Sequence, residues 1–223
     1  MPFAYNQFKP VVLTFAMLLA VTLNCTRASA APAQTAIFAG GCFWCVESDF
    51  ESVPGVIDVV SGFIGGKVAN PSYKEVTKGG TGHVEAAKIT YDPARVDYAK
   101  LVSLFFRSVD PTDAGGQFCD RGASYATAIF VSNASQNAIA KAEKASAQKA
   151  LGKKIVTPIR KATTFYPADA SHQDYYKKTS IVLTRFGPRT KAEAYKRYRK
   201  ACGRDKQVQK LWGKNAPFIK GQS

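Results

Sequence analysis

The spacing of apolar residues predicts a strand, a helix and a second strand after residue 30. The apolar run at residues 35–39 predicts a buried strand. Residues 46–53 then carry apolar side chains at helical spacing, and Pro54 ends the pattern. Residues 56–64 are rich in β-branched side chains, which is typical of a strand. Residues 40–45 therefore lie at a turn between the first strand and the helix.

A loop, an alternating segment and an amphipathic helix follow. Residues 67–82 are polar and contain glycine and proline, so they predict a long loop, which holds Tyr73. Polar and apolar residues alternate from 83 to 92, as in a strand with one buried face. Residues 97–107 repeat apolar side chains every three or four positions, which predicts a helix with a buried stripe.

The second half of the chain has weaker patterns. They predict a loop (110–122), a strand (124–131), a helix (135–151), an edge strand (154–165), a short helix (172–179) and a basic helix (190–201). In the 135–151 helix only a narrow alanine face, Ala138, Ala142 and Ala145, is available for packing. Short strands and helices that alternate irregularly predict one mixed α/β (α+β) domain, with helices packed on a partly antiparallel sheet.

The first 30 residues have the layout of a secretory signal peptide. Lys9 precedes an apolar run at 11–23, which is short for a bilayer-spanning helix, and Ala28-Ser29-Ala30 forms a small-residue cleavage site. A retained membrane anchor is the alternative. With a cleaved signal, we expect an exported protein, periplasmic or secreted, without stable membrane association.

The rest of the chain has the length of one domain and a strong positive charge. About 190 residues suit a single domain, 31–223, with a polar basic C-terminal extension from about residue 190. The net charge is +15, or +13 without residues 1–30, because that segment holds Lys9 and Arg27 and no acid. The cations are scattered and do not interleave with aromatic residues along one face. We therefore expect a solvated surface, no nucleic-acid partner and a monomer.

Cys42 lies in the sequence Gly-Gly-Cys-Phe-Trp-Cys at residues 40–45, where the first predicted strand turns into the helix. The glycines permit a tight turn. A helix start presents unpaired N–H groups and a partial positive charge, and both stabilise a thiolate over a thiol. Cys42 is therefore the predicted nucleophile. Phe43 and Trp44 beside it are candidates for the wall of an apolar substrate pocket.

Glu85 is the candidate acid. On the alternating segment it shares a face with Ala87, Ile89 and Tyr91. A carboxyl group that loses water on such a face holds its proton more tightly, as a general acid must near neutral pH. The alternative is a hydrated glutamate at the start of an edge strand.

The motif Gly-Cys-Phe-Trp at 41–44 is the first of a series of short sequence blocks. The others are Pro-Gly-Val at 54–56, Gly-Phe-Ile-Gly-Gly at 62–66, Asn-Pro-Ser-Tyr-Lys-Glu-Val at 70–76, Gly-Gly-Thr-Gly-His-Val-Glu at 79–85, Tyr-Asp-Pro at 91–93, Asp-Pro-Thr at 110–112, Asp-Arg-Gly-Ala-Ser-Tyr at 120–125 and His-Gln-Asp-Tyr at 172–175. In this order they resemble the peptide methionine sulfoxide reductases that act on the S epimer. The resemblance covers about residues 37–176, and several ordered blocks are far more specific than one Cys-x-x-Cys motif.

The resemblance implies a two-layer α/β sandwich and the reduction of methionine-S-sulfoxide, free or in proteins, to methionine. It implies that Cys42 is the nucleophile and becomes a sulfenic acid, and that no metal or organic cofactor is required. The other implied roles are proton donation to the sulfoxide oxygen (Glu85), hydrogen bonding and ordering around that oxygen (Tyr73, Tyr125 and Asp120), and contact with the S-methyl group (Phe43 and Trp44).

A second thiol must condense with the sulfenic acid to form a disulfide, which an external, thioredoxin-like dithiol then reduces. Cys45 lies one helical turn from Cys42, at a position that is often glycine in the family. Cys202 follows the basic helix near the C-terminus, where the family often carries its resolving cysteine. Cys119 precedes Asp120. All three are candidates, and Cys45 is the first of them.

Two other classes of protein fit part of the pattern. A thioredoxin-like thiol–disulfide oxidoreductase also has Cys-x-x-Cys at a helix start, but that class gives no role to Glu85. A non-enzymatic zinc-binding module would use Cys42 and Cys45 as half of a site and more distant cysteines or His83 as the rest. The sequence lacks the second close pair of ligands that structural zinc usually has.

Overall fold

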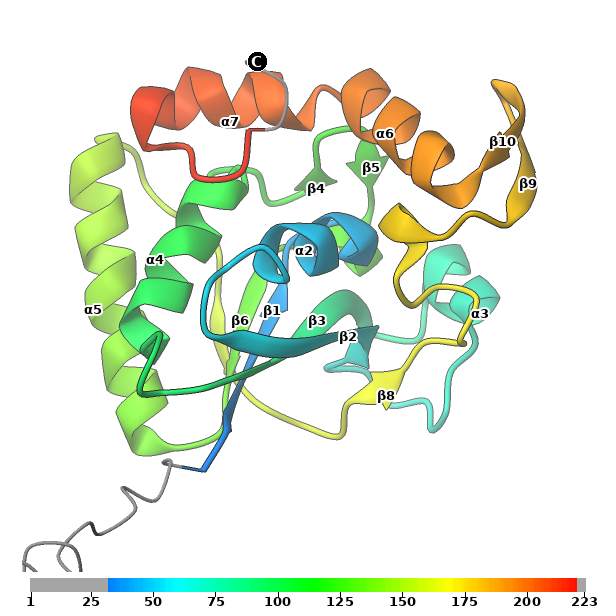
Figure 1. Ribbon diagram of the computed structural model, residues 1–223. Helices are drawn as coiled ribbons and strands as arrows, with labels where there is room; N and C mark the ends of the chain where they lie inside the picture. The colour runs from blue at the N-terminus through cyan, green and yellow to red at the C-terminus, as the bar shows by residue number, and fades with distance from the viewer. Residues whose placement is uncertain (1–31, 220–223) are drawn as a thin grey trace, which may run out of the picture. The chain divides into compact units, whose positions relative to one another are not determined.

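A six-stranded mixed sheet forms the centre of the computed structural model, which describes residues 32–219 (Figure 1). In order across the sheet, the strands are β7 (Ile159–Lys161), β6 (Ala128–Val131), β1 (Gln34–Ala39), β3 (Val84–Tyr91), β2 (Val56–Ile64) and β8 (Tyr166–Pro167). β6 and β7 are parallel, and the other neighbouring pairs in this sheet are antiparallel. The predicted mixture of parallel and antiparallel pairing is confirmed.

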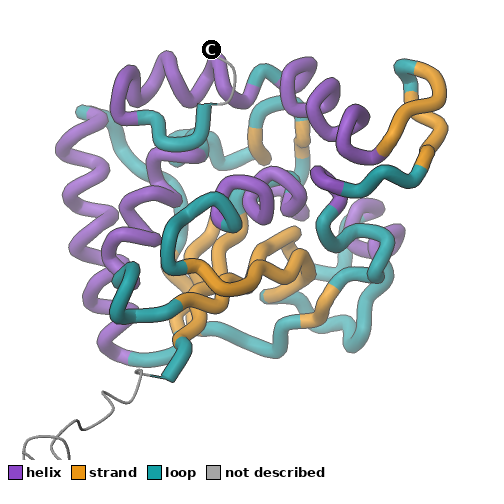
Figure 2. The backbone as a smooth tube through the Cα atoms, in the orientation of Figure 1, coloured by secondary structure: helices purple, strands orange, loops and turns teal. Residues whose placement is uncertain are grey.

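Helices α2 (Phe43–Phe50), α4 (Tyr98–Ser108), α5 (Ala134–Leu151) and α7 (Arg204–Trp212) pack on one face of the sheet (Figures 1 and 2). Helices α3 (Tyr73–Lys78) and α6 (Lys191–Cys202) lie beside it. The main core joins the sheet to α2, α4, α5 and α7, and contains the stacked rings of Phe38 and Phe105, whose centroids are 4.9 Å apart. On the other face, Phe130 packs with Ala162 and Phe165. This two-layer arrangement confirms the predicted fold class.

Several small elements lie outside the sheet. They are two antiparallel strand pairs, β4 (Gly116–Gln117) with β5 (Asp120–Arg121) and β9 (Ile181–Thr184) with β10 (Gly187–Thr190), and 3₁₀ turns at Ala123–Tyr125, Tyr175–Lys177 and Gly213–Asn215. β9 and β10 form a hairpin that projects beside α6, at the upper right of Figure 1.

Segments with a strong apolar repeat have the bounds that the sequence predicts. β2 spans the predicted strand at 56–64, and β3 lies within 83–92. α4 occupies the helix predicted at 97–107, and the carboxylate of its N-cap residue Asp97 accepts the N–H of Lys100 at 2.6 Å. A polar cap followed by a buried apolar stripe defines this helix locally.

Segments with a weak repeat differ from the prediction. The loop predicted at 67–82 contains α3, which begins with a capping box in which Ser72 and Glu75 accept each other's backbone N–H groups. The strands predicted at 124–131 and 154–165 are shorter, because only β6 and β7 form within them. The helix predicted at 172–179 is a single 3₁₀ turn.

α5 lies where it was predicted but turns another face to the core. It begins after Asn133 rather than Ser135, and Gly152 ends it in the left-handed conformation, as predicted. Its buried side chains are Gln136, Ala140 and Ala147, whereas the predicted face of Ala138, Ala142 and Ala145 is exposed.

The basic segment from about residue 190 forms α6 and α7. α6 was predicted and α7 was not. Both helices pack on the domain and bury Tyr195 and Trp212. The predicted signal segment, residues 1–30, lies outside the described residues. Within residues 32–219, the helices are all too short or too polar to cross a bilayer.

Candidate active site

Cys42 lies at the turn between β1 and α2, where it is the N-cap residue of the helix. The preceding Gly41 has a φ of 78°, and a Cβ at this position would lie 2.6 Å from the Cβ of Gln117. Glycine is therefore required both for the turn and for the close approach of β4. Two hydrogen bonds to the backbone of Asp110 hold the Gln117 side chain in place. The predicted position of Cys42 at a helix start is confirmed.

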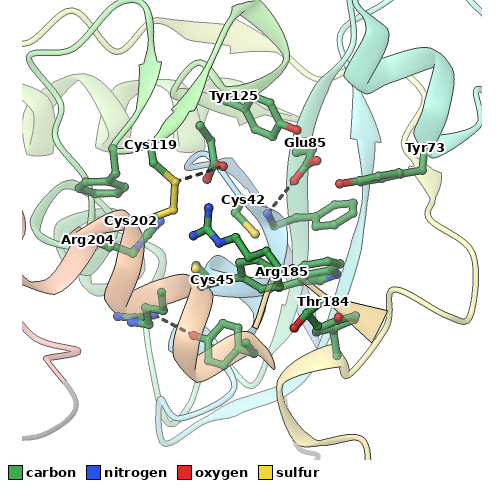
Figure 3. A pocket seen from close by; sticks show the side chains of 18 of the residues that line it. Cys42, Cys45, Tyr73, Glu85, Cys119, Tyr125, Thr184, Arg185, Cys202 and Arg204 are labelled. Carbon is green, nitrogen blue, oxygen red and sulfur yellow. Dashed lines mark hydrogen bonds between the residues drawn. A yellow bond between two sulfur atoms is a disulfide. The ribbon is translucent and has the colours of Figure 1, made fainter. Parts of the chain in front are cut away.

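A cavity of about 520 Å³ opens at this helix start (Figure 3). All ten candidate residues predicted from the sequence line it. They are Cys42, Phe43, Trp44, Cys45, Tyr73, Glu85, Cys119, Asp120, Tyr125 and Cys202. These side chains come from the start of α2, from α3 and β3, from the β4–β5 hairpin, from a 3₁₀ turn and from the end of α6. Tertiary packing therefore brings them together.

Glu85 is almost completely buried, with 1% of its surface exposed. The backbone N–H of Phe43 donates to its Oε2 at 3.0 Å, which places the carboxyl group beside the residue that follows Cys42. Loss of water on burial is the main reason why the pKa of Glu85 is raised to about 8. The hydrogen bond from the Phe43 N–H lowers this pKa, and the negative charges of Asp120 and Cys45 raise it further. At neutral pH the group is mostly protonated and can donate a proton. The hydrated alternative is wrong.

Tyr73 and Tyr125 line the same cavity as Glu85, and their hydroxyl groups point into it (Figure 3). Burial is the main cause that raises the pKa of both phenols, so both remain protonated donors at neutral pH. The ring of Tyr73 also stacks on His172, with 4.3 Å between centroids. Burial likewise raises the pKa of Asp120. The cavity thus offers several hydrogen-bond donors close to Glu85.

Phe43 and Trp44 form an apolar wall next to Cys42. Trp44 stacks on Tyr175 with 3.7 Å between ring centroids, and Phe43 is buried against Phe63. A small apolar group that enters the cavity would lose water against this wall. The sequence predicted the wall, whereas the support from Tyr175 comes from a distant segment.

The free thiols of Cys42 and Cys45 are hydrogen-bonded and titrate as a pair. The bond to Cys45 and then burial raise the pKa of the Cys42 thiol. This direction is opposite to the lowering that the helix start predicts. The same bond, followed by the charges of Arg204 and Arg199, lowers the pKa of Cys45 to about 7 despite its burial. The directions of the two shifts favour Cys45 over Cys42 as the thiol of the pair that loses its proton first.

Two buried arginines of the C-terminal helices support the site, and neither was predicted from the sequence. Arg199 forms an ion pair with Asp49 of α2 at 2.7 Å. Arg204 is 2% exposed and donates to the carbonyl oxygens of Gly40 at 3.1 Å and Ser108 at 3.0 Å. In the sequence both belong to a basic run, and nothing in their spacing separates them from the exposed cations around them.

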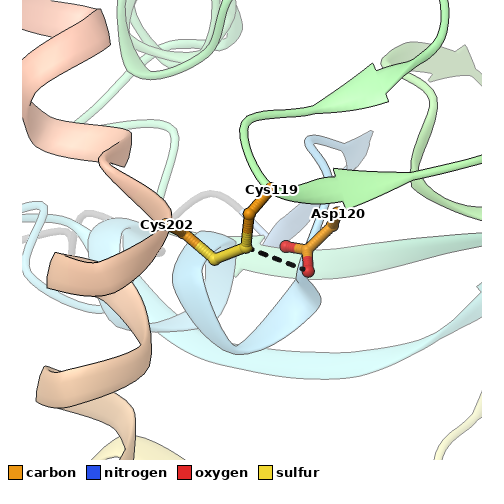
Figure 4. A group of neighbouring side chains, drawn as sticks. All are labelled: Cys119, Asp120 and Cys202. Atoms are coloured by element: carbon orange, nitrogen blue, oxygen red, sulfur yellow. Dashed lines mark hydrogen bonds between the residues drawn. A yellow bond between two sulfur atoms is a disulfide. The ribbon is translucent and has the colours of Figure 1, made fainter.

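Cys119 and Cys202 form a disulfide at the edge of the cavity (Figure 4). Their Cα atoms are 4.8 Å apart, although 83 positions separate them in sequence. The bond ties the end of α6 to the residue before Asp120, whose Oδ1 lies 3.7 Å from the Sγ of Cys119. Because a disulfide sulfur carries no hydrogen, this approach is a contact and not a donated hydrogen bond.

The comparison with known proteins decides between the classes that the sequence suggested. A family model described as peptide methionine sulfoxide reductase matches residues 34–215. The chain belongs to this family. Its match extends beyond residue 176 and includes α6 and α7, so the basic segment is part of the matched region.

Individual relatives agree with the family. The chain is similar to a peptide methionine sulfoxide reductase MsrA 2 from Rhizobium meliloti, with 51% identity over 85% of this chain and 88% of the relative. A relative of the same name from Caulobacter vibrioides is 44% identical over 91% of this chain and 98% of the relative. The solved structure of methionine sulfoxide reductase A of Corynebacterium diphtheriae is 30% identical, with a TM-score of 0.57 over 64% of this chain and 73% of that one.

This member of the family is an oxidoreductase that reduces methionine-S-sulfoxide to methionine, as the ordered sequence blocks predicted. The family needs no prosthetic cofactor. The comparisons favour neither a thioredoxin-like oxidoreductase nor a zinc-binding module. For zinc, Cys119 and Cys202 are bonded to each other and therefore offer no thiolate ligands.

Proposed function

We propose that Cys42 and Glu85 together carry out the reduction of methionine-S-sulfoxide. One observation carries this proposal: a carboxyl group that is mostly protonated at neutral pH shares a cavity with a free cysteine at a helix start. A sulfoxide oxygen is a poor leaving group until it is protonated, and Glu85 holds the proton that this step needs.

In the first step, the Sγ of Cys42 attacks the substrate sulfur, and the proton of Cys42 passes to the Cys45 thiolate. Glu85 gives its proton to the sulfoxide oxygen, which accepts hydrogen bonds from Tyr73 and Tyr125 while the apolar wall holds the S-methyl group. Transfer of the resulting hydroxyl group to Cys42 releases methionine and leaves a sulfenic acid. Both protons are thus accounted for within the cavity.

In the second step, Cys45 attacks the sulfur of the sulfenic acid, a water molecule leaves with the Cys45 proton, and a Cys42–Cys45 disulfide forms. Cys45 is favoured because it already hydrogen-bonds Cys42 and because nearby arginines stabilise its thiolate. Cys119 and Cys202 are bonded to each other and have no free thiol to offer. Glu85 recovers its proton from solvent water.

The Cys119–Cys202 disulfide is proposed to hold the C-terminal helices on the cavity rather than to react in each turnover. It joins the end of α6, which places Arg199 near Cys45, to the residue before β5, the strand that carries Asp120. Asp120 is proposed to order the polar groups on that side of the cavity.

The proposal extends to the location of the protein and to its partners. The signal-like pattern of residues 1–30 supports export to the periplasm or the medium, and so does a disulfide, since disulfides persist in oxidising compartments. There, a thioredoxin-like dithiol would reduce the Cys42–Cys45 disulfide. The substrates would be oxidised proteins or peptides, and the working unit a monomer.

The first test is Cys42→Ser. The variant should form no methionine from a peptide that contains methionine-S-sulfoxide, with dithiothreitol or with a thioredoxin system as the reductant. Circular dichroism of the variant serves as the control for folding. Wild-type turnover by folded Cys42→Ser protein would show that the nucleophile is another residue.

The second test concerns the resolving thiol. Without reductant, Cys45→Ser should still form one equivalent of methionine per chain, more slowly than wild type, and should then accumulate a sulfenic acid that dimedone traps. With a thioredoxin system its turnover should nearly stop, whereas Cys202→Ser should recycle at close to the wild-type rate. The reverse pattern would assign the resolving role to Cys202.

A further inference from the structure

The β9–β10 hairpin and α6 lie side by side in Figure 1. They expose apolar and basic side chains, and Leu183 and Arg185 of the hairpin line the cavity. Side chains alternate between the two faces of β9, so Ile181 and Leu183 share its outer face. They are 74% and 85% exposed. Arg185 lies in the turn of the hairpin, Arg197 lies on α6, and both are exposed. We call these four residues the hairpin surface.

The hairpin surface is continuous with the cavity. Leu183 and Arg185 line the cavity together with Cys42, and Figure 3 shows Arg185 on the Cys45 side of it. On the inner side of the hairpin, Val182 packs against the cluster that contains Cys45. A polypeptide with its methionine sulfoxide in the cavity would therefore have its neighbouring residues within reach of the surface, because residues of an extended chain are only about 3.4 Å apart.

The charge of this region is strongly one-sided. Residues 177–200 contain nine lysines and arginines and one acid, Glu193, whose carboxylate is engaged in the capping box of α6. The guanidinium groups of Arg185 and Arg197 lie 4.9 and 5.8 Å from the centroid of the Phe186 ring. Within residues 32–219, neither guanidinium forms a salt bridge. Two neighbouring cations are thus available to a carboxylate from outside.

We propose that the hairpin surface binds the polypeptide that flanks the methionine sulfoxide and favours substrates with acidic residues beside it. Arg185 and Arg197 would bind the carboxylates, and Ile181 and Leu183 would contact apolar side chains and lose water. An extended acidic segment suits the surface because its charge is complementary. The inference rests on the proposed function and names the class of its protein substrate.

Three substrates separate the flanking sequence from the reaction itself. They are N-acetyl methionine-S-sulfoxide, a peptide in which glutamates flank methionine-S-sulfoxide, and the same peptide with glutamine in place of each glutamate. At low salt, kcat/KM of wild type should be about tenfold higher for the glutamate peptide, and the difference should shrink at high salt, where exposed charges are screened. Equal values for the two peptides would overturn the proposal.

The double variant Ile181→Ser/Arg197→Gln removes part of the hairpin surface. Neither residue lines the cavity, so the catalytic groups are unchanged. Its kcat/KM on the glutamate peptide should fall about fivefold because KM rises while kcat stays the same. Its kcat and KM on N-acetyl methionine-S-sulfoxide should equal those of wild type. The matched control, Lys141→Gln on α5, removes an exposed charge elsewhere and should keep the wild-type preference. An equal loss in the control would mean that only net charge matters, and the proposal would fail.

The same variant distinguishes the other possible occupants. An increased KM for a thioredoxin-like reductant with unchanged peptide kinetics would assign the surface to the reductant and overturn the proposal. Self-association of wild type in sedimentation that the double variant abolishes would assign it to a second copy of the chain, with the same consequence. If wild type does not reduce N-acetyl methionine-S-sulfoxide at all, the proposed function itself is wrong.

Discussion

At the scale of single residues, the ionisation of Glu85 and of the Cys42–Cys45 pair determines when the enzyme can react. Glu85 keeps its proton up to about pH 8 because it is buried. Cys45 loses its proton near pH 7 because Cys42 hydrogen-bonds it and because Arg204 and Arg199 lie close. The proposed first step needs a protonated Glu85 and an ionised pair. These two requirements overlap in a narrow range of pH.

The first prediction is a bell-shaped pH profile. kcat/KM should rise through about pH 7, as the thiol pair ionises, and fall through about pH 8, as Glu85 loses its proton. Glu85→Gln should lower kcat/KM by about 10²- to 10⁴-fold and abolish the alkaline fall. Initial rates on N-acetyl methionine-S-sulfoxide check this, with Glu143→Gln on α5 as the control. An alkaline fall that persists in Glu85→Gln would belong to another group.

The second prediction concerns stability. In the folded protein the pKa of Glu85 is about 8, whereas in the unfolded chain it is about 4.3. Since the folded state binds the proton more tightly, the Glu85 contribution to stability is present at low pH and is lost as the pH rises towards 8. Glu85→Gln lacks this loss, and its amide oxygen can still accept the Phe43 N–H.

Urea unfolding measures this difference. Near pH 5 the two proteins should have similar free energies of unfolding, and at pH 9 the variant should be more stable by on the order of 3 kcal/mol. The raised pKa of Glu47, about 7, is common to both proteins and cancels in the comparison. An equal dependence on pH in both proteins would show that Glu85 is hydrated in solution.

At the scale of elements, the sequence predicted those whose burial follows a local repeat. α4 and β3 have such a repeat and were predicted correctly. α3 and α7 do not: α3 depends on the Ser72 capping box, and α7 on a buried arginine, Arg204, and on Trp212. In α5, alanines occur on several sides of the helix, so composition did not reveal which side meets the core.

The third prediction tests the contact between α7 and the turn before Cys42. Arg204→Met should raise the apparent pKa at which the Cys42–Cys45 pair first ionises, from about 7 towards the ordinary value, because a positive charge near Cys45 is removed. It should also lower the free energy of unfolding by about 3 kcal/mol, since buried carbonyl groups lose their donor. The rate of alkylation by iodoacetamide as a function of pH gives the thiol pKa.

Lys200→Met is the matched control for this variant. Lys200 is an exposed cation on the last turn of α6, so its removal should change neither the thiol pKa nor the stability appreciably. If Arg204→Met unfolds, its thiol pKa is measured in Arg204→Lys, which keeps the charge and should keep the pKa near 7. An unchanged pKa in folded Arg204→Met would assign the effect to Arg199.

At the scale of the whole molecule, the sequence predicted those residues of the candidate site that lie within short motifs. The resemblance extended to residue 176 and supplied Cys42, Glu85, Tyr73 and Tyr125, which the structure brings into one cavity. Arg204 lies beyond those motifs and reaches Gly40 across 164 positions of sequence. No local sequence pattern predicts such a contact, because the fold alone determines which cation of a basic run is buried and which are exposed.

The last prediction concerns the disulfide between Cys119 and Cys202, which ties the end of α6 to the residue before β5. Cys119 and Cys202 are 83 positions apart, and a cross-link of this span stabilises a folded chain by about 4 kcal/mol, mainly by restricting the unfolded state. Urea unfolding of Cys119→Ser/Cys202→Ser should show a loss of about this size. Because Cys42 and Cys45 remain, the variant should still form methionine and be recycled by a thioredoxin system.

The amount of methionine formed without reductant separates a structural disulfide from a catalytic one. Wild type in which all four described cysteines are reduced should form a single equivalent per chain, because only the Cys42–Cys45 pair supplies electrons, and the double variant should form the same amount. Two equivalents from wild type and one from the variant would mean that Cys119 and Cys202 pass electrons to the inner pair. The C-terminal helices would then be held differently in each half of the catalytic cycle, since the link between α6 and the residue before β5 would open and close with every turnover.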